Sequence, residues 1–215
     1  MNNEFAFPRI IEKFSVAGEL ISCERYGEGH INDTFKVTMD DCGREVHYIL
    51  QRINNRLFPD VDRLMHNIEL VTEFCRKSVI ERGGDPMREC LTLIRTKDGA
   101  SYTCEDGNYF RMYVFIEGAT TYQSVRDPRD FYESAVAFGN FANLLAKFDA
   151  SQLYEILPDF HNTKVRYENF LRAVEKDICG RAEEVRSEID WVKSRSDLCG
   201  KIVDKIASGE IPLLR

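Results

Sequence analysis

The chain has 215 residues, of which 43% are hydrophobic and 30% charged, and its formal net charge is −7. A chain of this length can bury a sizeable core and predicts one domain or two small ones. The acidic balance, without a basic stripe, argues against a nucleic-acid-binding surface. We expect no membrane span, because no apolar run reaches about 18 residues, and no signal peptide, because "MNNEFAFPRIIEKF" lacks a basic start and an apolar core.

Seven cysteines are scattered along the sequence without a CxxC pair, and the four histidines show no metal-ligand spacing with them or with each other. This pattern predicts reduced thiols that serve mostly as small buried hydrophobic side chains. Unpaired thiols are typical of the cytosol, so we expect a cytoplasmic protein.

The first predicted elements are three strands in which apolar and polar residues alternate, the period of a half-buried strand. The second and third are joined by Asp40-Asp41-Cys42-Gly43, a turn with glycine where a positive φ is expected. The strands cover residues 19–25, 34–39 and 45–54.

A helix over 61–79 follows, predicted from apolar residues at three- and four-residue spacing, and it ends before Gly83-Gly84-Asp85-Pro86. Asp98-Gly99 and Asp106-Gly107 then predict hairpin turns. They separate three further strands, at 91–95, 101–105 and 108–117.

The second half is predicted to be helical. Asp127 and Pro128 are a helix start, and the stripe that follows runs from Phe131 to Phe148. After a loop at 157–163, two helical stretches are expected, the last from about residue 181 to 208 with Gly209 at its C-cap. The final "IPLLR" is expected to begin another strand. The order predicts an α+β fold whose sheet region gives way to helices near 117–122.

Several stretches resemble the aminoglycoside phosphotransferase superfamily of small-molecule kinases, which has a protein-kinase-like fold. Within it, the sequence looks most like the N-acetylhexosamine 1-kinases, from about residue 10 to the last residue. The stretches that carry the resemblance are "GEGHINDTFKV", "YILQRIN", "GGDP" with "CLTLIRTKDG", "YVFIEGATTY" and "LPDFHNT".

The resemblance implies a two-lobe architecture, with a kinase-like N-lobe at 1–118 and the first helices of an incomplete C-lobe at 119–215. It implies transfer of the γ-phosphate of ATP, with Mg²⁺, to the anomeric hydroxyl of N-acetylglucosamine or N-acetylgalactosamine. The partners would be a nucleotide and a small-molecule sugar, and the oligomeric state is left open. Alternatives are another acceptor (an aminoglycoside, choline, homoserine or another sugar) or a non-catalytic nucleotide-binding module.

The turn between the first two strands would lie over the phosphates. Gly27 and Gly29 allow close backbone approach, although Asn32 replaces the third glycine of a kinase-type loop and an ordinary hairpin turn is the alternative. The resemblance gives His30 and Asp33 a role in contacting the sugar. The structural alternative for Asp33 or Asn32 is to cap the turn.

The third strand should supply a cation for the phosphates, paired with a helix glutamate. Alternation makes Arg52 the candidate, with Gln51 favoured if the register differs. Glu69 is the expected helix partner, and Glu73 competes with it. Backbone groups of about Phe115 to Glu117 would meet adenine, as a hinge does.

The catalytic aspartate and the later metal-binding aspartate are missing from the sequence. None of the four histidines (residues 30, 47, 66 and 161) is followed two residues later by aspartate. Arg129-Asp130 and Asp159-Phe160-His161 imitate fragments of such motifs and are interpreted as structural. We therefore expect a chain that ends before the catalytic loop, with its metal ligands beyond residue 215, and that is inactive alone.

Overall fold

The computed structural model describes residues 5–120, 122 and 124–211. The chain divides into two compact units, Met1–Ile156 and Leu157–Arg215. The predicted division into lobes at 118/119 stays a prediction. Among the described residues, none of the helices combines the length and the apolar character that a bilayer crossing requires.

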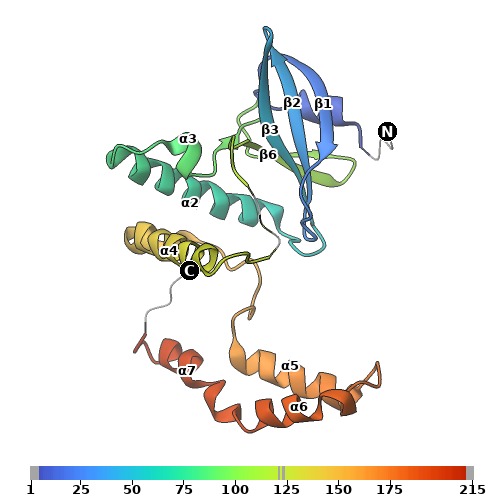
Figure 1. Cartoon of the computed structure of the whole chain (residues 1–215), viewed down its shortest axis with the longest axis vertical. Helices are drawn as coiled ribbons and strands as arrows, with labels where there is room; N and C mark the ends of the chain where they lie inside the picture. Colours follow the sequence, from blue (N-terminus) through green and yellow to red (C-terminus); the bar gives the residue numbers. More distant parts are fainter. Residues whose placement is uncertain (1–4, 121, 123, 212–215) are drawn as a thin grey trace. The chain divides into compact units, whose positions relative to one another are not determined.

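The first unit is built on an antiparallel sheet, which confirms the mixed helix-and-sheet class (Figure 1). The strand order is β1-β2-β3-β6-β4, and β5 also pairs with β6. Each of the six strand regions expected between residues 19 and 117 contains a strand. The strands are β1 (Glu19–Arg25), β2 (Asp33–Asp41), β3 (Arg44–Ile53), β4 (Leu93–Ile94), β5 (Thr103–Glu105) and β6 (Asn108–Val114).

Two of the three predicted turns join paired strands as expected. The hairpin expected at Asp98-Gly99 is wrong, because β4 and β5 each pair with β6 and not with each other. Cys42 and Gly43, with φ of 56° and 88°, join β2 to β3, and Asp106 and Gly107, with φ of 50° and 74°, join β5 to β6. Two consecutive positive φ values are the geometry of the two-residue turn whose twist matches that of paired strands. The Asp40 carboxylate accepts a hydrogen bond from the Gly43 N–H at 2.6 Å and holds the first turn.

One side of the sheet, which we call the α1 side, packs against α1 (Phe7–Ile11). α1 could not be predicted from the sequence, because five residues make little more than one turn and show no periodicity. Its apolar residues close the main core. The buried cluster consists of Ile10, Ile11, Phe14, Phe35, Val37, Met39, Leu50, Phe110 and Met112.

The other side, which we call the α2 side, packs against α2 (Val61–Glu81), the helix predicted over 61–79. The Asp60 side chain caps α2 by accepting a hydrogen bond from the Arg63 N–H. Val61 and Met65 are buried with Ile53 of β3. Since side chains alternate along a strand, odd-numbered residues of β3 and β6 lie on the α2 side and even-numbered residues on the α1 side.

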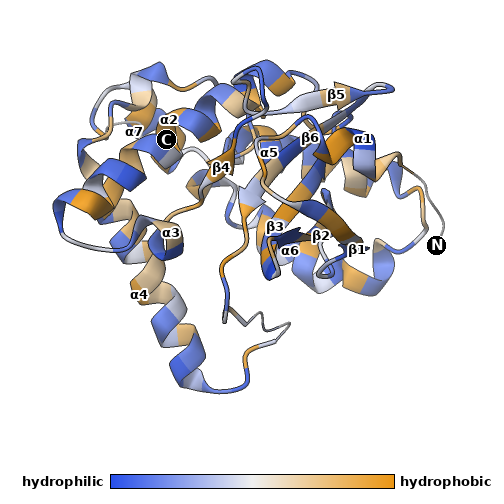
Figure 2. Cartoon of the chain, turned by 90° about the horizontal axis from the view of Figure 1, so that it is seen from above, coloured by the Kyte–Doolittle hydropathy of each residue, from blue (hydrophilic) through white to orange (hydrophobic). Residues whose placement is uncertain are grey.

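Two further helices follow in the first unit, α3 (Pro86–Glu89) and α4 (Pro128–Leu144), each beginning with a capping aspartate and a proline. The start of α4 is as predicted, whereas α3 was missed because "GGDP" was interpreted only as a helix end. The α4 stripe is not a buried face: Phe131 and Phe138 are 69% and 74% exposed. Figure 2 shows hydrophobic and hydrophilic residues alternating along α4. Short 3-10 turns follow at Leu145–Lys147 and Ala150–Gln152.

The second unit contains α5 (Thr163–Lys176), α6 (Arg186–Lys193) and α7 (Lys201–Ala207), with 3-10 turns at Glu183–Val185 and Ser196–Leu198. The single helix predicted over 181–208 is wrong, because serines and Gly200 between α6 and α7 favour a break. Gly209, with φ of 76°, follows the end of α7 as expected. Ile189 is the one buried hydrophobic residue among the described residues of this unit. The strand expected at "IPLLR" lies almost entirely outside the described residues.

The cysteines are free, as predicted, but most of them are not buried. Only Cys75 and Cys90 are buried, and both belong to a small cluster with Val79 of α2. The expectation that the thiols are mostly core residues is therefore wrong.

Candidate functional site

The turn between β1 and β2 carries the two predicted phosphate-loop glycines. Gly27 has a φ of 74°, and a Cβ built on it meets nothing within 4 Å. Its backbone conformation therefore favours glycine, while its surroundings are open. His30 is exposed in the same turn. Tyr26 anchors the turn to the sheet, because its N–H donates to the Thr34 carbonyl at 2.8 Å.

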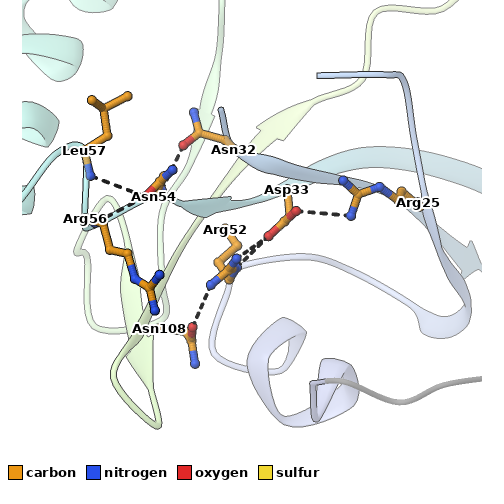
Figure 3. A network of polar contacts seen from close by, with 8 residues as sticks. All are labelled: Arg25, Asn32, Asp33, Arg52, Asn54, Arg56, Leu57 and Asn108. Carbon is orange, nitrogen blue, oxygen red and sulfur yellow. Dashed lines mark hydrogen bonds and ion pairs between the residues drawn. The ribbon is translucent and has the colours of Figure 1, made fainter. Parts of the chain in front are cut away.

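Asp33 and Arg52 are brought together at the start of β2 (Figure 3). Arg52 Nε donates to Asp33 Oδ2 at 2.7 Å, and Arg25 Nη1 donates to Asp33 Oδ1 at 3.1 Å. Arg52 Nη1 also donates to Asn108 Oδ1 at 3.1 Å, and its guanidinium lies over the Phe5 ring. The charge of Arg52 is thus neutralised by a carboxylate of the adjacent strand.

This network lies on the α1 side of the sheet, because Asp33 and Arg52 are register partners and Arg52 in turn faces Phe110. Asn32 does not cap its own turn; its side-chain oxygen accepts from the Asn54 N–H at 2.9 Å (Figure 3). The sugar-binding role of Asp33 and the phosphate-binding role of Arg52 stay predictions. Of the two neighbouring β3 residues, Gln51 lies on the α2 side of the sheet and Arg52 on the α1 side.

The ion pairs of Asp33 should make the free energy of unfolding depend on pH. Burial alone would raise the pKa of Asp33, but hydrogen bonds and charge from Arg52 and then Arg25 lower it below its ordinary value. A lowered folded pKa means that this stabilisation is present above the ordinary carboxyl pKa and is lost as the pH falls through the folded pKa. Asp33→Asn should therefore cost about 1 kcal/mol at pH 7 and flatten the loss of stability below about pH 4.

The measurement is urea unfolding followed by circular dichroism at several pH values between neutral and acidic. Asp41→Asn is the matched control, since Asp41 is an exposed aspartate at the other end of β2. An Asp33→Asn variant with the same pH profile as the wild type would contradict the assigned role of the two arginines.

The α2 side carries a polar row that the sequence analysis missed. Thr34, Gln51 and Arg111 are register partners across β2, β3 and β6. Gln51 Nε2 donates to Thr34 Oγ1 at 3.0 Å, and Gln51 Oε1 accepts from Arg111 Nη2 at 2.7 Å and Nε at 3.1 Å. The sequence signal that could have revealed this row is the single arginine inside the otherwise mostly apolar strand "NYFRMYV".

Glu69 lies on α2 but does not meet Arg52. It forms an ion pair with Arg95 at 2.8 Å. Burial would raise the pKa of Glu69, whereas hydrogen bonds from Ser101 and Arg95 lower it, so the carboxylate is held ionised. The competing Glu73 pairs with Lys77 along the helix. The expected pair between a β3 cation and a helix glutamate is therefore absent from the described residues.

The predicted hinge follows β6. The Phe115 N–H donates to the His47 carbonyl at 3.3 Å, and the Glu117 carbonyl accepts from Arg88 at 2.9 Å. The Phe115 ring contacts Tyr26 edge-on, with centroids 5.6 Å apart. An aromatic pair thus joins the segment after β6 to the glycine turn, and the adenine-binding role of 115–117 stays a prediction.

The two stretches that resemble catalytic motifs, Arg129-Asp130 and Asp159-Phe160-His161, lie at or next to the starts of helices. Asp130 lies in the first turn of α4, behind the capping Asp127. Asp159 accepts a hydrogen bond from Asn162, the residue that caps α5. Within the described part of the chain, no three His, Cys, Asp or Glu side chains are grouped to hold a metal ion.

Comparison with solved structures finds distant similarities, one of which is described below. No family model matches the sequence. Among solved structures, the chain is similar to an aminoglycoside phosphotransferase from Alicyclobacillus acidocaldarius subsp. acidocaldarius DSM 446, with 12% sequence identity and a TM-score of 0.45. The match covers 78% of this chain and 42% of that chain, so the chain spans less than half of that protein.

Proposed function

We propose that this chain is the nucleotide-binding portion of an ATP-dependent phosphotransferase whose acceptor is an N-acetylhexosamine. The observation that carries the proposal is the order of elements in the first unit. Three antiparallel strands are followed by α2, and β6 then pairs with β3 and leads out of the sheet. A sheet of this kind with a long helix after its third strand is the arrangement that kinases use to cover a nucleotide.

Two local features support the same proposal. A turn with a positive-φ glycine joins the first two strands, where backbone amides could approach a phosphate. The hinge strand lies beside that turn through the contact of Phe115 with Tyr26. The choice of an N-acetylhexosamine comes from the sequence resemblance in "GHINDT" and "YILQRIN".

Mg²⁺ would come with the nucleotide in this proposal, since kinases bridge the β- and γ-phosphates with the metal. The chain's own contribution would be to bind and orient the phosphates at the glycine turn and to enclose the base at the hinge. No step of phosphoryl transfer is assigned to the described residues.

The proposal is tested by titrating the 215-residue chain with magnesium and a non-hydrolysable ATP analogue while following thermal unfolding. A ligand that binds only the folded chain stabilises it by about 2.7 kcal/mol at a hundredfold excess over its Kd. We expect saturable stabilisation by the ATP analogue and additional protection by N-acetylglucosamine or N-acetylgalactosamine. Protection by choline, homoserine or an aminoglycoside instead would change the acceptor, and no response to millimolar nucleotide would refute the proposal.

A further inference from the structure

Arg111 differs from most buried arginines in that it forms no ion pair with any carboxylate of the described residues. Its side chain contacts the Gln51 side-chain oxygen, the Met65 sulfur at 3.8 Å and the Tyr113 ring at 5.3 Å. Among the described residues, no Asp or Glu oxygen lies within ion-pair distance of it. Burial lowers the pKa of Arg111, but an arginine pKa is so high that the guanidinium stays charged.

Two other arginines near the same sheet differ from Arg111 in this respect. Arg52 pairs with Asp33, and Arg95 pairs with Glu69. A charge removed from water without a counter-charge is costly, and an anion bound beside it would offset part of that cost. A half-buried guanidinium surrounded by neutral groups therefore suits an anion.

Gln51 fixes the direction of this guanidinium. Because the Gln51 amide nitrogen donates to Thr34 Oγ1, its oxygen is turned toward Arg111 and accepts from Nε and Nη2. Arginine has five N–H donors, so part of the Nη1 and Nη2 edge remains for another acceptor. A planar fork held in this way matches the oxygen atoms of a phosphate.

The position of Arg111 also fits a kinase-like site. The strand cation of a kinase pairs with a glutamate of the helix that covers the sheet, so it lies on the helix side. On that side β3 presents Gln51, which has no charge, while Arg111 lies directly across on β6. Arg52 points to the α1 side and is already paired.

We propose that Arg111, oriented by Gln51, is the cation that binds a phosphate group of the nucleotide, in place of a cation on β3. The inference rests on the proposed function for the identity of the nucleotide. The site itself is an oxyanion site for a phosphate or pyrophosphate group between β3, β6 and α2.

The test is isothermal titration of the 215-residue chain with inorganic pyrophosphate and with the magnesium complex of a non-hydrolysable ATP analogue. Arg111→Met should weaken both by about 10-fold to 100-fold, the loss of a charge-assisted contact. Arg111→Lys keeps the charge but loses the fork, and Gln51→Met frees the guanidinium, so each should weaken binding by about 10-fold. Arg44→Met, an exposed arginine at the start of β3, is the matched control.

Thermal unfolding shows which variants are folded. If Arg111→Met does not fold, the affinities of Arg111→Lys and Gln51→Met test the role of Arg111 in binding. Unchanged affinity in these variants, or a larger loss in Arg52→Met, overturns the inference while nucleotide binding stands. Wild-type binding of pyrophosphate but not of the ATP analogue supports the anion site and refutes the proposed function. Wild-type binding of neither ligand overturns both.

Discussion

Phe110→Ala is expected to destabilise the first unit by about 3–5 kcal/mol, the usual cost of deleting a buried aromatic ring. Phe110 is fully buried at the centre of the α1-side core. Its ring lies edge-to-face with Phe5, with centroids 5.6 Å apart. Truncation would remove that contact and leave a cavity beneath β6, the strand that also carries Arg111.

The measurement is urea unfolding monitored by far-ultraviolet circular dichroism, because the single Trp191 lies in the second unit and does not report on the sheet. Phe138→Ala is the matched control: the same atoms are removed from a residue of α4 that is 74% exposed. It should change the free energy of unfolding by less than about 0.5 kcal/mol. Equal effects of the two substitutions would contradict the assignment of the core.

Gly18→Ala is expected to be strongly destabilising for two reasons that can be separated. Gly18 has a φ of 87°, and a Cβ at this position would lie 2.1 Å from the Asp40 carbonyl oxygen. The overlapping atom belongs to the backbone of β2, next to the pairing of β1 with β2. The overlap can therefore be relieved only if the backbone at this edge of the sheet moves. We expect a loss of about 1–2 kcal/mol from the left-handed conformation and about 1–3 kcal/mol more from the overlap.

Gly43→Ala isolates the first of these costs. Gly43 has a φ of 88°, but a Cβ built on it meets nothing within 4 Å. It should therefore lose only the conformational part, and the difference between the two variants measures the close approach of Gly18 to Asp40. Equal unfolding free energies for Gly18→Ala and Gly43→Ala would show that the strand edge moves without cost.

Much of the sheet could be predicted from the sequence because its signals are local. Alternation in β1, β2 and β3 and the Asp-Gly turn at 106–107 depend on neighbours within a few residues. The same holds for α4, whose capping Asp127 and Pro128 stand next to each other. Short elements such as α1 and α3 carry too few residues for a periodic pattern.

The candidate site could be predicted only in part, because the partners of its charged residues come from distant strands. Arg52 was assigned to a helix glutamate, but strand register places it beside Asp33, and Glu69 instead meets Arg95. Arg111 was overlooked, since its significance depends on facing Gln51 across 60 residues of sequence. Residue type suggests the chemistry, whereas pairing register decides which charges are already neutralised.

The scarcity of buried residues in the second unit has a consequence for how folding free energy is distributed along the chain. With Ile189 as the one buried hydrophobic residue described there, α5, α6 and α7 have little apolar burial to oppose their chain entropy. Local opening of that unit therefore costs far less than global unfolding of the sheet. Backbone amides of these helices would exchange with solvent while those of β3 and β6 remain protected, so the two units would unfold one after the other rather than together.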